Sequence, residues 1–184
     1  MHAGGPAREI ADLVGRPEDS WRFRTTLLDQ DEEALKQAQT DINGTEEHYS
    51  EDGKPTVRYL KQSIGMLMRP GEERDRLGQF DFIYSMGLFD YLDAQTARKL
   101  TTSLLALLKP GGTLLVGNYS AANTSRVYIE YWCDWWLIHR TKEELLEFVG
   151  PDQRKTHDTT VELDSSGSQF FLRALKKAPV LARL

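Results

Sequence analysis

The stretch of residues 80–119 constrains the fold more than any other part of the chain. It contains a short apolar run at 82–84 and a second one at 113–116. Between these runs, apolar residues recur at helical spacing over residues 93–108. The pattern predicts a strand, a helix and a second strand parallel to the first. Because both strands are nearly continuously apolar, we expect a sheet that is covered on both faces.

A Lys-Pro-Gly-Gly sequence at 109–112 predicts the end of the helix, since proline cannot continue a helix and glycine adopts the angles of a tight reversal. Phe-Asp-Phe-Ile at 80–83 and Leu-Lys-Pro-Gly-Gly at 108–112 together resemble the second half of class I S-adenosylmethionine (SAM)-dependent methyltransferases. The resemblance implies an α/β, Rossmann-like three-layer sandwich, with a mostly parallel sheet and a C-terminal antiparallel hairpin. It also implies SAM as cofactor and S-adenosyl-L-homocysteine (SAH) as product. The alternative is an unrelated doubly wound α/β domain.

The composition of the 184 residues narrows the class of protein. The net charge of −5 argues against nucleic acid as the main partner. No apolar run approaches the roughly 20 residues that span a bilayer, and no signal-peptide pattern is present. One cysteine, Cys133, excludes an internal disulfide and a cysteine-based zinc site, and we expect no metal. We therefore expect a cytoplasmic protein that acts on a small molecule.

The start of the sequence resembles only part of the family pattern. Gly4 and Gly5 precede Pro6, which suits the first turn of a helix. They resemble the end of the family's cofactor-binding glycine loop, where glycine lets the backbone come close to the ligand. The strand and the acidic residue that precede this loop in the family have no counterpart here. We expect a single methyltransferase-like domain over 1–184 that is truncated at its N-terminus. Alternatively, the two glycines belong to a flexible segment.

Asp29 follows a predicted strand at 23–28 and precedes a helix that Asp31 is expected to cap. An acidic side chain at such a strand end can accept hydrogen bonds from both hydroxyls of a ribose, about 20 residues past the glycines in dinucleotide folds. The sequence at 27–35 also resembles the family's second motif, which favours Asp29 as the ribose ligand. The alternative is that Asp29 caps or solvates a turn.

Two further predicted strands end in candidate cofactor contacts. Ser63 and Ile64 come after the strand at 57–60, where the family places residues against the adenine; packing at the strand end explains them equally well. Ser85, Met86 and Gly87 follow the strand at 82–84, and ligands of open parallel sheets bind at the carboxyl ends of the strands.

Residues 128–140 are the most unusual part of the sequence, since 132–136 alone contain three of the four tryptophans. Aromatic residues so close together point to several sides of a helix, so we expect some of them to line a pocket or a partner surface. We interpret the segment as the wall of a dry substrate site; a filled core with a dimer contact is the alternative. The candidate substrate contacts are Tyr91, Tyr119, Tyr128, Tyr131, Trp135 and Arg140. The guanidinium of Arg140 would pair with a substrate carboxylate.

His139 and Asp90 are the candidate catalytic residues, each able to take a proton from a nucleophile. The near-neutral pKa typical of histidine makes His139 eligible, although a structural histidine is the more common case. The sequence thus predicts SAM-dependent methyl transfer to an oxygen nucleophile, a hydroxyl or a carboxylate, of a small molecule. The alternative is a non-catalytic SAM-binding or structural domain. Residues 132–148 also resemble bacterial methyltransferases linked to hydroxy-fatty-acid methyl esters.

Two local signals complete the predictions. Thr141 and Glu144 form a capping-box pattern that opens a short helix. Residues 159–163 and 169–175 flank a turn and predict a hairpin, an ending that distinguishes methyltransferases from dinucleotide-dependent oxidoreductases. A sheet that lacks a strand has an uncovered edge, so a homodimer is a further expectation.

Overall fold

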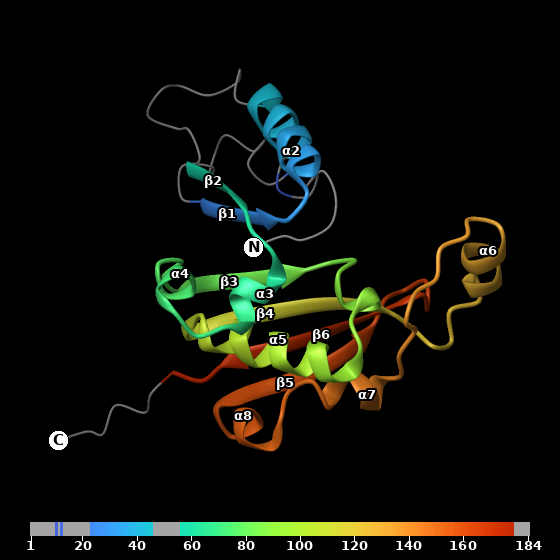
Figure 1. Ribbon diagram of the computed structural model, residues 1–184. Helices are drawn as coiled ribbons and strands as arrows, with labels where there is room; N and C mark the ends of the chain where they lie inside the picture. The colour runs from blue at the N-terminus through green and yellow to red at the C-terminus, as the bar shows by residue number, and fades with distance from the viewer. Residues whose placement is uncertain (1–9, 11, 13–22, 46–55, 179–184) are drawn as a thin grey trace. The chain divides into compact units, whose positions relative to one another are not determined.

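The computed structural model describes residues 10, 12, 23–45 and 56–178 (Figure 1). The chain divides into two compact units, Met1–Ile64 and Gly65–Leu184, called unit 1 and unit 2 below and each described by itself. The predicted cofactor contacts Gly4 and Gly5 lie outside the described residues. The single truncated domain expected from the sequence stays a prediction.

Unit 1 contains a parallel pair of strands, β1 (Arg24–Asp29) and β2 (Thr56–Lys61), which contact helix α2 (Glu32–Thr45). The two strands pair in register from Arg24 with Thr56 to Asp29 with Lys61. Asp31 caps α2 as predicted, because its Oδ1 accepts the N–H of Glu33 at 2.9 Å. The core of the unit comes from β1 and from one face of α2, through Leu27, Leu28, Leu35, Ala38 and Ile42.

Unit 2 is built on a four-stranded sheet in the order β3-β4-β6-β5. Its strands are β3 (Phe80–Ser85), β4 (Leu108–Tyr119), β5 (His157–Leu163) and β6 (Gln169–Lys176). β3 and β4 are parallel, whereas β6 is antiparallel to both β4 and β5. The strand–helix–strand unit and the C-terminal hairpin are therefore confirmed. The expected mostly parallel sheet is not found in this unit, because the hairpin inserts β6 beside β4 and makes the sheet mixed.

Helix α5 (Ala94–Ala106) connects β3 to β4. Asp93 caps it by accepting the N–H of Thr96 at 2.9 Å, and its buried residues include Ala97, Leu100 and Leu104. Helix α5 ends at Ala106, shortly before the Lys-Pro-Gly-Gly sequence, but residues 109–112 lie inside β4 rather than in a separate turn. They form an irregular stretch of the strand, since Phe80 pairs with Leu108 but Phe82 pairs with Thr113.

The other elements are short. They are α3 (Ile64–Met68), α4 (Glu72–Asp75), the 3₁₀ turn η4 (Phe89–Tyr91), α6 (Arg126–Tyr131), α7 (Lys142–Leu146) and α8 (Pro151–Thr156). The predicted capping box opens α7, where Thr141 accepts the N–H of Glu144 and the Glu144 carboxylate accepts the N–H of Thr141. The aromatic segment is helical only in α6; its tryptophans lie beyond the helix, where Asp134 adopts a φ of 48°.

Candidate functional site

In unit 1, the carboxyl ends of the parallel strands bring three predicted residues to one edge of the pair. Asp29 ends β1, is half-buried, and accepts the N–H of Asp31 on its Oδ1 at 2.9 Å. Its main-chain oxygen accepts the N–H of Gln62 at 2.9 Å, which links the end of β1 to the residue after β2. Ser63 is exposed at this edge, and Ile64 is the first residue of α3. The edge thus presents a carboxylate and a hydroxyl.

In unit 2, the carboxyl end of β3 holds Ser85, Met86 and Gly87. Ser85 is buried, and its Oγ has no hydrogen-bond partner among the described residues. Gly87 has a φ of 75°, the left-handed region that favours glycine, and a Cβ added to it would meet nothing within 4 Å. Met86 packs on β4, where a Cβ on Gly117 would lie 2.5 Å from its Sδ. The strand end therefore combines an unsatisfied hydroxyl with open space at Gly87.

Asp90 lies in the turn η4 and is buried, with 1% of its surface exposed. Its Oδ1 accepts the N–H of Tyr119 at 2.7 Å, and its main-chain oxygen accepts the N–H of Ile138 at 2.8 Å. Its Oδ2 has no hydrogen-bond partner in the described part of the chain. Burial raises the pKa of Asp90, while the N–H of Tyr119 and the charge of Arg140 lower that pKa. Asp90 thus links the turn η4 to the end of β4 and to the segment at Ile138. One of its carboxylate oxygens could still accept a hydrogen bond.

Arg140 is also buried, and the protein itself engages its guanidinium. The group donates to the main-chain oxygens of Phe89, at 2.7 Å, and of Leu92. It also donates to Oδ1 of Asn118, and it lies 5.0 Å from the centre of the Phe148 ring. Burial lowers the pKa of Arg140, and the negative charge of Asp90 raises it. These contacts favour a role in holding the site together over the predicted pairing with a substrate carboxylate.

Asn118 was not among the candidate site residues predicted from the sequence. Its Nδ2 donates to the main-chain oxygens of Ile138, at 2.9 Å, and of Tyr119, at 3.0 Å, while its Oδ1 accepts from Arg140. This buried amide therefore fastens the segment before Arg140 to the end of β4. A polar residue at the end of an apolar run is the signal in the sequence that could have identified it.

His139 and Tyr119 lie together at the carboxyl end of β4, with their ring centres 5.7 Å apart. Nδ1 of His139 is 3.1 Å from the main-chain oxygen of Leu137. Because a carbonyl oxygen only accepts, this contact assigns the proton of the neutral ring to Nδ1 and leaves Nε2 as an acceptor. Nε2 is buried and has no partner among the described residues. The arrangement suits a group that takes up a proton.

Two further aromatic residues adjoin this cluster. The ring of Trp135 meets the ring of Tyr119 edge to face, at 6.4 Å between centres, and its Nε1 donates to the hydroxyl of Tyr91. Burial raises the pKa of Tyr119, and the nearby charge of Asp90 raises it further, so its hydroxyl stays protonated. Tyr91, Tyr119 and Trp135 thus form an aromatic border next to His139.

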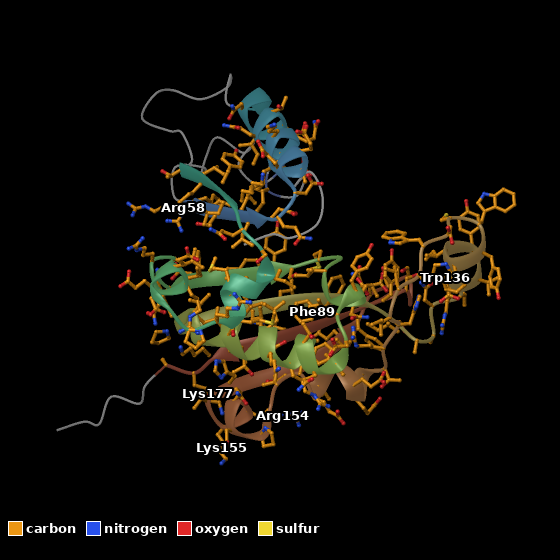
Figure 2. The ribbon with its side chains drawn as sticks, in the orientation of Figure 1. Arg58, Phe89, Trp136, Arg154, Lys155 and Lys177 are labelled. Atoms are coloured by element: carbon orange, nitrogen blue, oxygen red, sulfur yellow. The ribbon has the colours of Figure 1, made fainter. Side chains whose placement is uncertain are left out.

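Tyr128 and Tyr131 do not join the cluster. Both are exposed on α6, where Tyr128 stacks on Trp132 and Tyr131 meets Trp136 edge to face. Figure 2 shows Trp136 on the part of unit 2 that carries α6, whereas Phe89 lies in the interior of the unit. The predicted substrate contacts therefore fall into two groups, one around His139 and one on α6.

Neither a metal centre nor a membrane span is found in the described part of the chain. Its His, Cys, Asp and Glu side chains form no group of three or more that could hold a metal ion. None of its helices has both the length and the apolar character needed to cross a membrane.

No protein-family model matches the sequence, and no curated protein matches it. Among solved structures, magnesium protoporphyrin IX methyltransferase (ChlM) from Synechocystis PCC 6803, with bound SAH, matches 96% of this chain and 72% of its own chain, with a TM-score of 0.65 and 11% identity. The N-methyltransferase NodS from Bradyrhizobium japonicum WM9, in complex with SAH, matches 95% of this chain and 76% of its own, with a TM-score of 0.60 and 13% identity.

The SAM-dependent methyltransferase SibL matches 96% of this chain with a TM-score of 0.65 and 15% identity, but this chain spans only 49% of SibL. At such identities the likeness concerns the fold. Together with the strand–helix–strand unit and the terminal hairpin, it confirms the resemblance seen in residues 80–119: the chain has the α/β fold of class I SAM-dependent methyltransferases.

Proposed function

We propose that this protein is a SAM-dependent methyltransferase that methylates an oxygen nucleophile, a hydroxyl or a carboxylate, on a small molecule. The shared fold supports methyl transfer in general, and the SAH bound in ChlM and NodS supports SAM as the cofactor. One observation carries the proposal of a nucleophile that must lose a proton, such as a hydroxyl. It is the buried Nε2 of His139, an acceptor without a partner among the described residues at the carboxyl end of β4.

In each unit, side chains at the strand ends are the proposed cofactor contacts. The carboxylate of Asp29 would accept hydrogen bonds from the ribose hydroxyls, and Ser85 Oγ, which lacks a partner in the described part of the chain, would gain one. Gly87 leaves room beside its backbone. When bound, SAM supplies a methyl group on a positively charged sulfur, which is already activated for transfer. The proposed cofactor contacts are Gly4, Gly5, Asp29, Ser63, Ile64, Ser85, Met86 and Gly87.

His139 is the proposed general base. With its Nδ1 proton directed at Leu137, its Nε2 would accept the proton of a substrate hydroxyl as the nucleophile attacks. The carboxylate of Asp90 would stabilise the imidazolium that results, since it is buried nearby and one of its oxygens lacks a partner within the described chain. A carboxylate substrate needs no base, and His139 would then only orient it.

The aromatic border is the proposed substrate wall. Tyr119 and Trp135 would exclude water beside His139, and Tyr91 would be held in place by the indole of Trp135. Tyr128 and Tyr131 would contact only a substrate long enough to reach α6. Arg140 would position Asp90 and the end of β4 through the hydrogen bonds described above.

The first test is calorimetric titration of the full chain with SAH, followed by assays with SAM that carries a radiolabelled methyl group. The acceptors are panels of phenols, aliphatic alcohols and carboxylic acids. Micromolar SAH binding with label transfer to an oxygen is the expected result. Binding without transfer to any panel would support the non-catalytic alternative, and the absence of binding would exclude a SAM-dependent function.

The second test distinguishes a role of His139 in proton transfer from a role in stabilising the fold. His139→Gln should lower kcat for a hydroxyl substrate by about 100-fold or more, because it removes the proton acceptor, and it should leave SAH binding unchanged. His157→Gln is the matched control. His157 is also buried with an unpartnered Nε2 in the described chain, but it begins β5 and so lies at the amino end of the sheet. Equal losses in both variants would show that His139 is only structural.

A further inference from the structure

Helix α6 exposes most of its apolar residues, whereas a helix that packs on the core of a soluble protein buries them. Glu130 is its one buried residue, 8% exposed, whereas Val127, Tyr128 and Tyr131 are exposed. The buried carboxylate is neutralised within the helix, since Arg126 Nε lies 2.7 Å from Glu130 Oε1. Residues 127, 128, 131 and 132 share one face at helical spacing. The helix therefore directs its apolar face away from the body of unit 2, which marks an interaction surface.

Four aromatic side chains make up this surface, called the aromatic tip: Tyr128, Tyr131, Trp132 and Trp136. Their exposed fractions lie between 60% and 80%. They pair among themselves, with ring centres 6.4 Å apart for Tyr128 and Trp132 and 5.9 Å apart for Tyr131 and Trp136. In Figure 1, α6 lies at one end of unit 2, beyond the carboxyl end of β4.

We propose that the aromatic tip docks into the headgroup region of an electrically neutral lipid surface. Tyrosine and tryptophan combine an apolar ring with a polar group, and both are enriched where membranes meet water. Exposed aromatic residues on a short helix would lie at the boundary between the lipid headgroups and water. The proposal rests on the exposed apolar face of α6 and does not depend on methyl transfer.

The area and the charge of the tip favour a lipid surface over other occupants. An aromatic side chain can bury about 150–250 Å², so four rings at these exposures offer about 400–700 Å². A stable protein interface needs about 800 Å² from each partner, which makes the tip too small for a second copy of the chain. Residues 126–138 contain one basic and two acidic residues, which disfavours anionic lipids and leaves a neutral, zwitterionic surface.

The test is flotation of the full chain with phosphatidylcholine vesicles. The chain should float with the vesicles, and lipids brominated near the headgroup should quench its tryptophan fluorescence. The double variant Trp132→Ser/Trp136→Ser should lower the partition coefficient by about tenfold or more, since such binding scales with buried apolar area. The control Phe82→Ser/Leu163→Ser also removes two exposed apolar side chains, but from the sheet, and should partition like the unaltered chain.

Three results would overturn the proposal. The chain fails to float at millimolar phosphatidylcholine, or both double variants lose binding equally. The third is a concentration-dependent dimer, seen by sedimentation velocity and abolished by Trp132→Ser/Trp136→Ser, which would show that the tip binds a second copy. Because flotation requires no SAM, these results are independent of those that test the proposed function.

Discussion

Arg140 Nη1 donates a hydrogen bond to Asn118 Oδ1 in the interior of unit 2, although the two residues are 22 positions apart. Asn118 also donates to Ile138, and the N–H of Arg140 donates to the main-chain oxygen of Tyr119 at 2.9 Å. These contacts lie at the end of β4, after the last residue that pairs with β3. Ser120 and Arg140 form an isolated parallel bridge there. The hydrogen bonds of Asn118 and Arg140 fix the backbone of His139 against the end of β4, so the candidate base depends on this pair.

Arg140→Lys should destabilise unit 2 by about 3 kcal/mol or more. The guanidinium donates to two main-chain oxygens and to the amide oxygen of Asn118, and a single ammonium group cannot reach all three. Buried acceptors would therefore be left without a hydrogen bond. Arg98→Lys is the control, since Arg98 pairs with Glu147 at the surface and should change stability by less than about 1 kcal/mol. Urea denaturation followed by circular dichroism measures both. Similar losses in the two variants would contradict a structural role for the Arg140 guanidinium.

Asp90 should make unit 2 more stable at acidic than at neutral pH. Burial raises the pKa of Asp90 in the folded protein above its ordinary value of 3.8, so the folded state binds this proton more tightly than the unfolded state. The resulting stability is fully present below pH 3.8 and is lost as the pH rises through the folded-state pKa. Asp90→Asn keeps an acceptor for the N–H of Tyr119 but does not titrate.

The measurement is the free energy of unfolding in urea from about pH 2.5 to about pH 7, with the variant subtracted from the unaltered protein at each pH. For Asp90→Asn the difference should fall as the pH rises. Asp164→Asn gives the opposite sign, because the side chain of Ser166 and the N–H of Gln169 lower the pKa of Asp164, so its contribution is lost as the pH falls. A difference for Asp90→Asn that rises with pH would contradict the burial argument.

Local signals in the sequence predicted the elements, and contacts distant in sequence decided the rest. The capping box at Thr141 and the hairpin depend on neighbouring residues, so their patterns were sufficient. Residues 109–112 lie within β4 because Leu108 already pairs with Phe80 across the sheet, while the shift in register before Thr113 and the positive φ of Gly111 keep a local turn there. No local pattern shows such a partner.

The same distinction applies to the site. His139 and Asp90 were predicted as proton acceptors and Tyr119 as a substrate contact, and the structure brings the three residues together. The engagement of Arg140 could not be predicted, since its acceptors on Phe89 and Leu92 are main-chain oxygens about 50 residues away. Likewise, no local pattern shows that the N–H of Ile138, beyond the end of α6, donates to the main-chain oxygen of Asp90.

Gly87→Ala should cost about 1–2 kcal/mol of stability, through backbone strain alone. Its φ of 75° is unfavourable for any residue with a Cβ, although a Cβ there would meet no neighbour within 4 Å. Gly71→Ala is the matched control, because that position is equally open but has an extended φ of 163° and should change stability by less than about 0.5 kcal/mol. Urea denaturation compares the two. Equal values would show that the turn after β3 relaxes without strain.

Asp29→Asn should weaken SAH binding by about tenfold or more, with little change in stability. The amide oxygen can still accept the N–H of Asp31, so the turn after β1 is kept. The amide nitrogen, however, cannot accept a ribose hydroxyl, and hydrogen bonds to a charged group contribute about 1.5–3 kcal/mol. Glu32→Gln removes the same charge three residues further on, from a carboxylate that pairs with Lys36 and Lys61 at the surface, and should leave SAH affinity unchanged. Calorimetric titration measures both affinities, and thermal melts confirm that both variants are folded. If Asp29→Asn binds SAH as tightly as the unaltered chain, Asp29 serves only the turn, and the cofactor must be held by other residues.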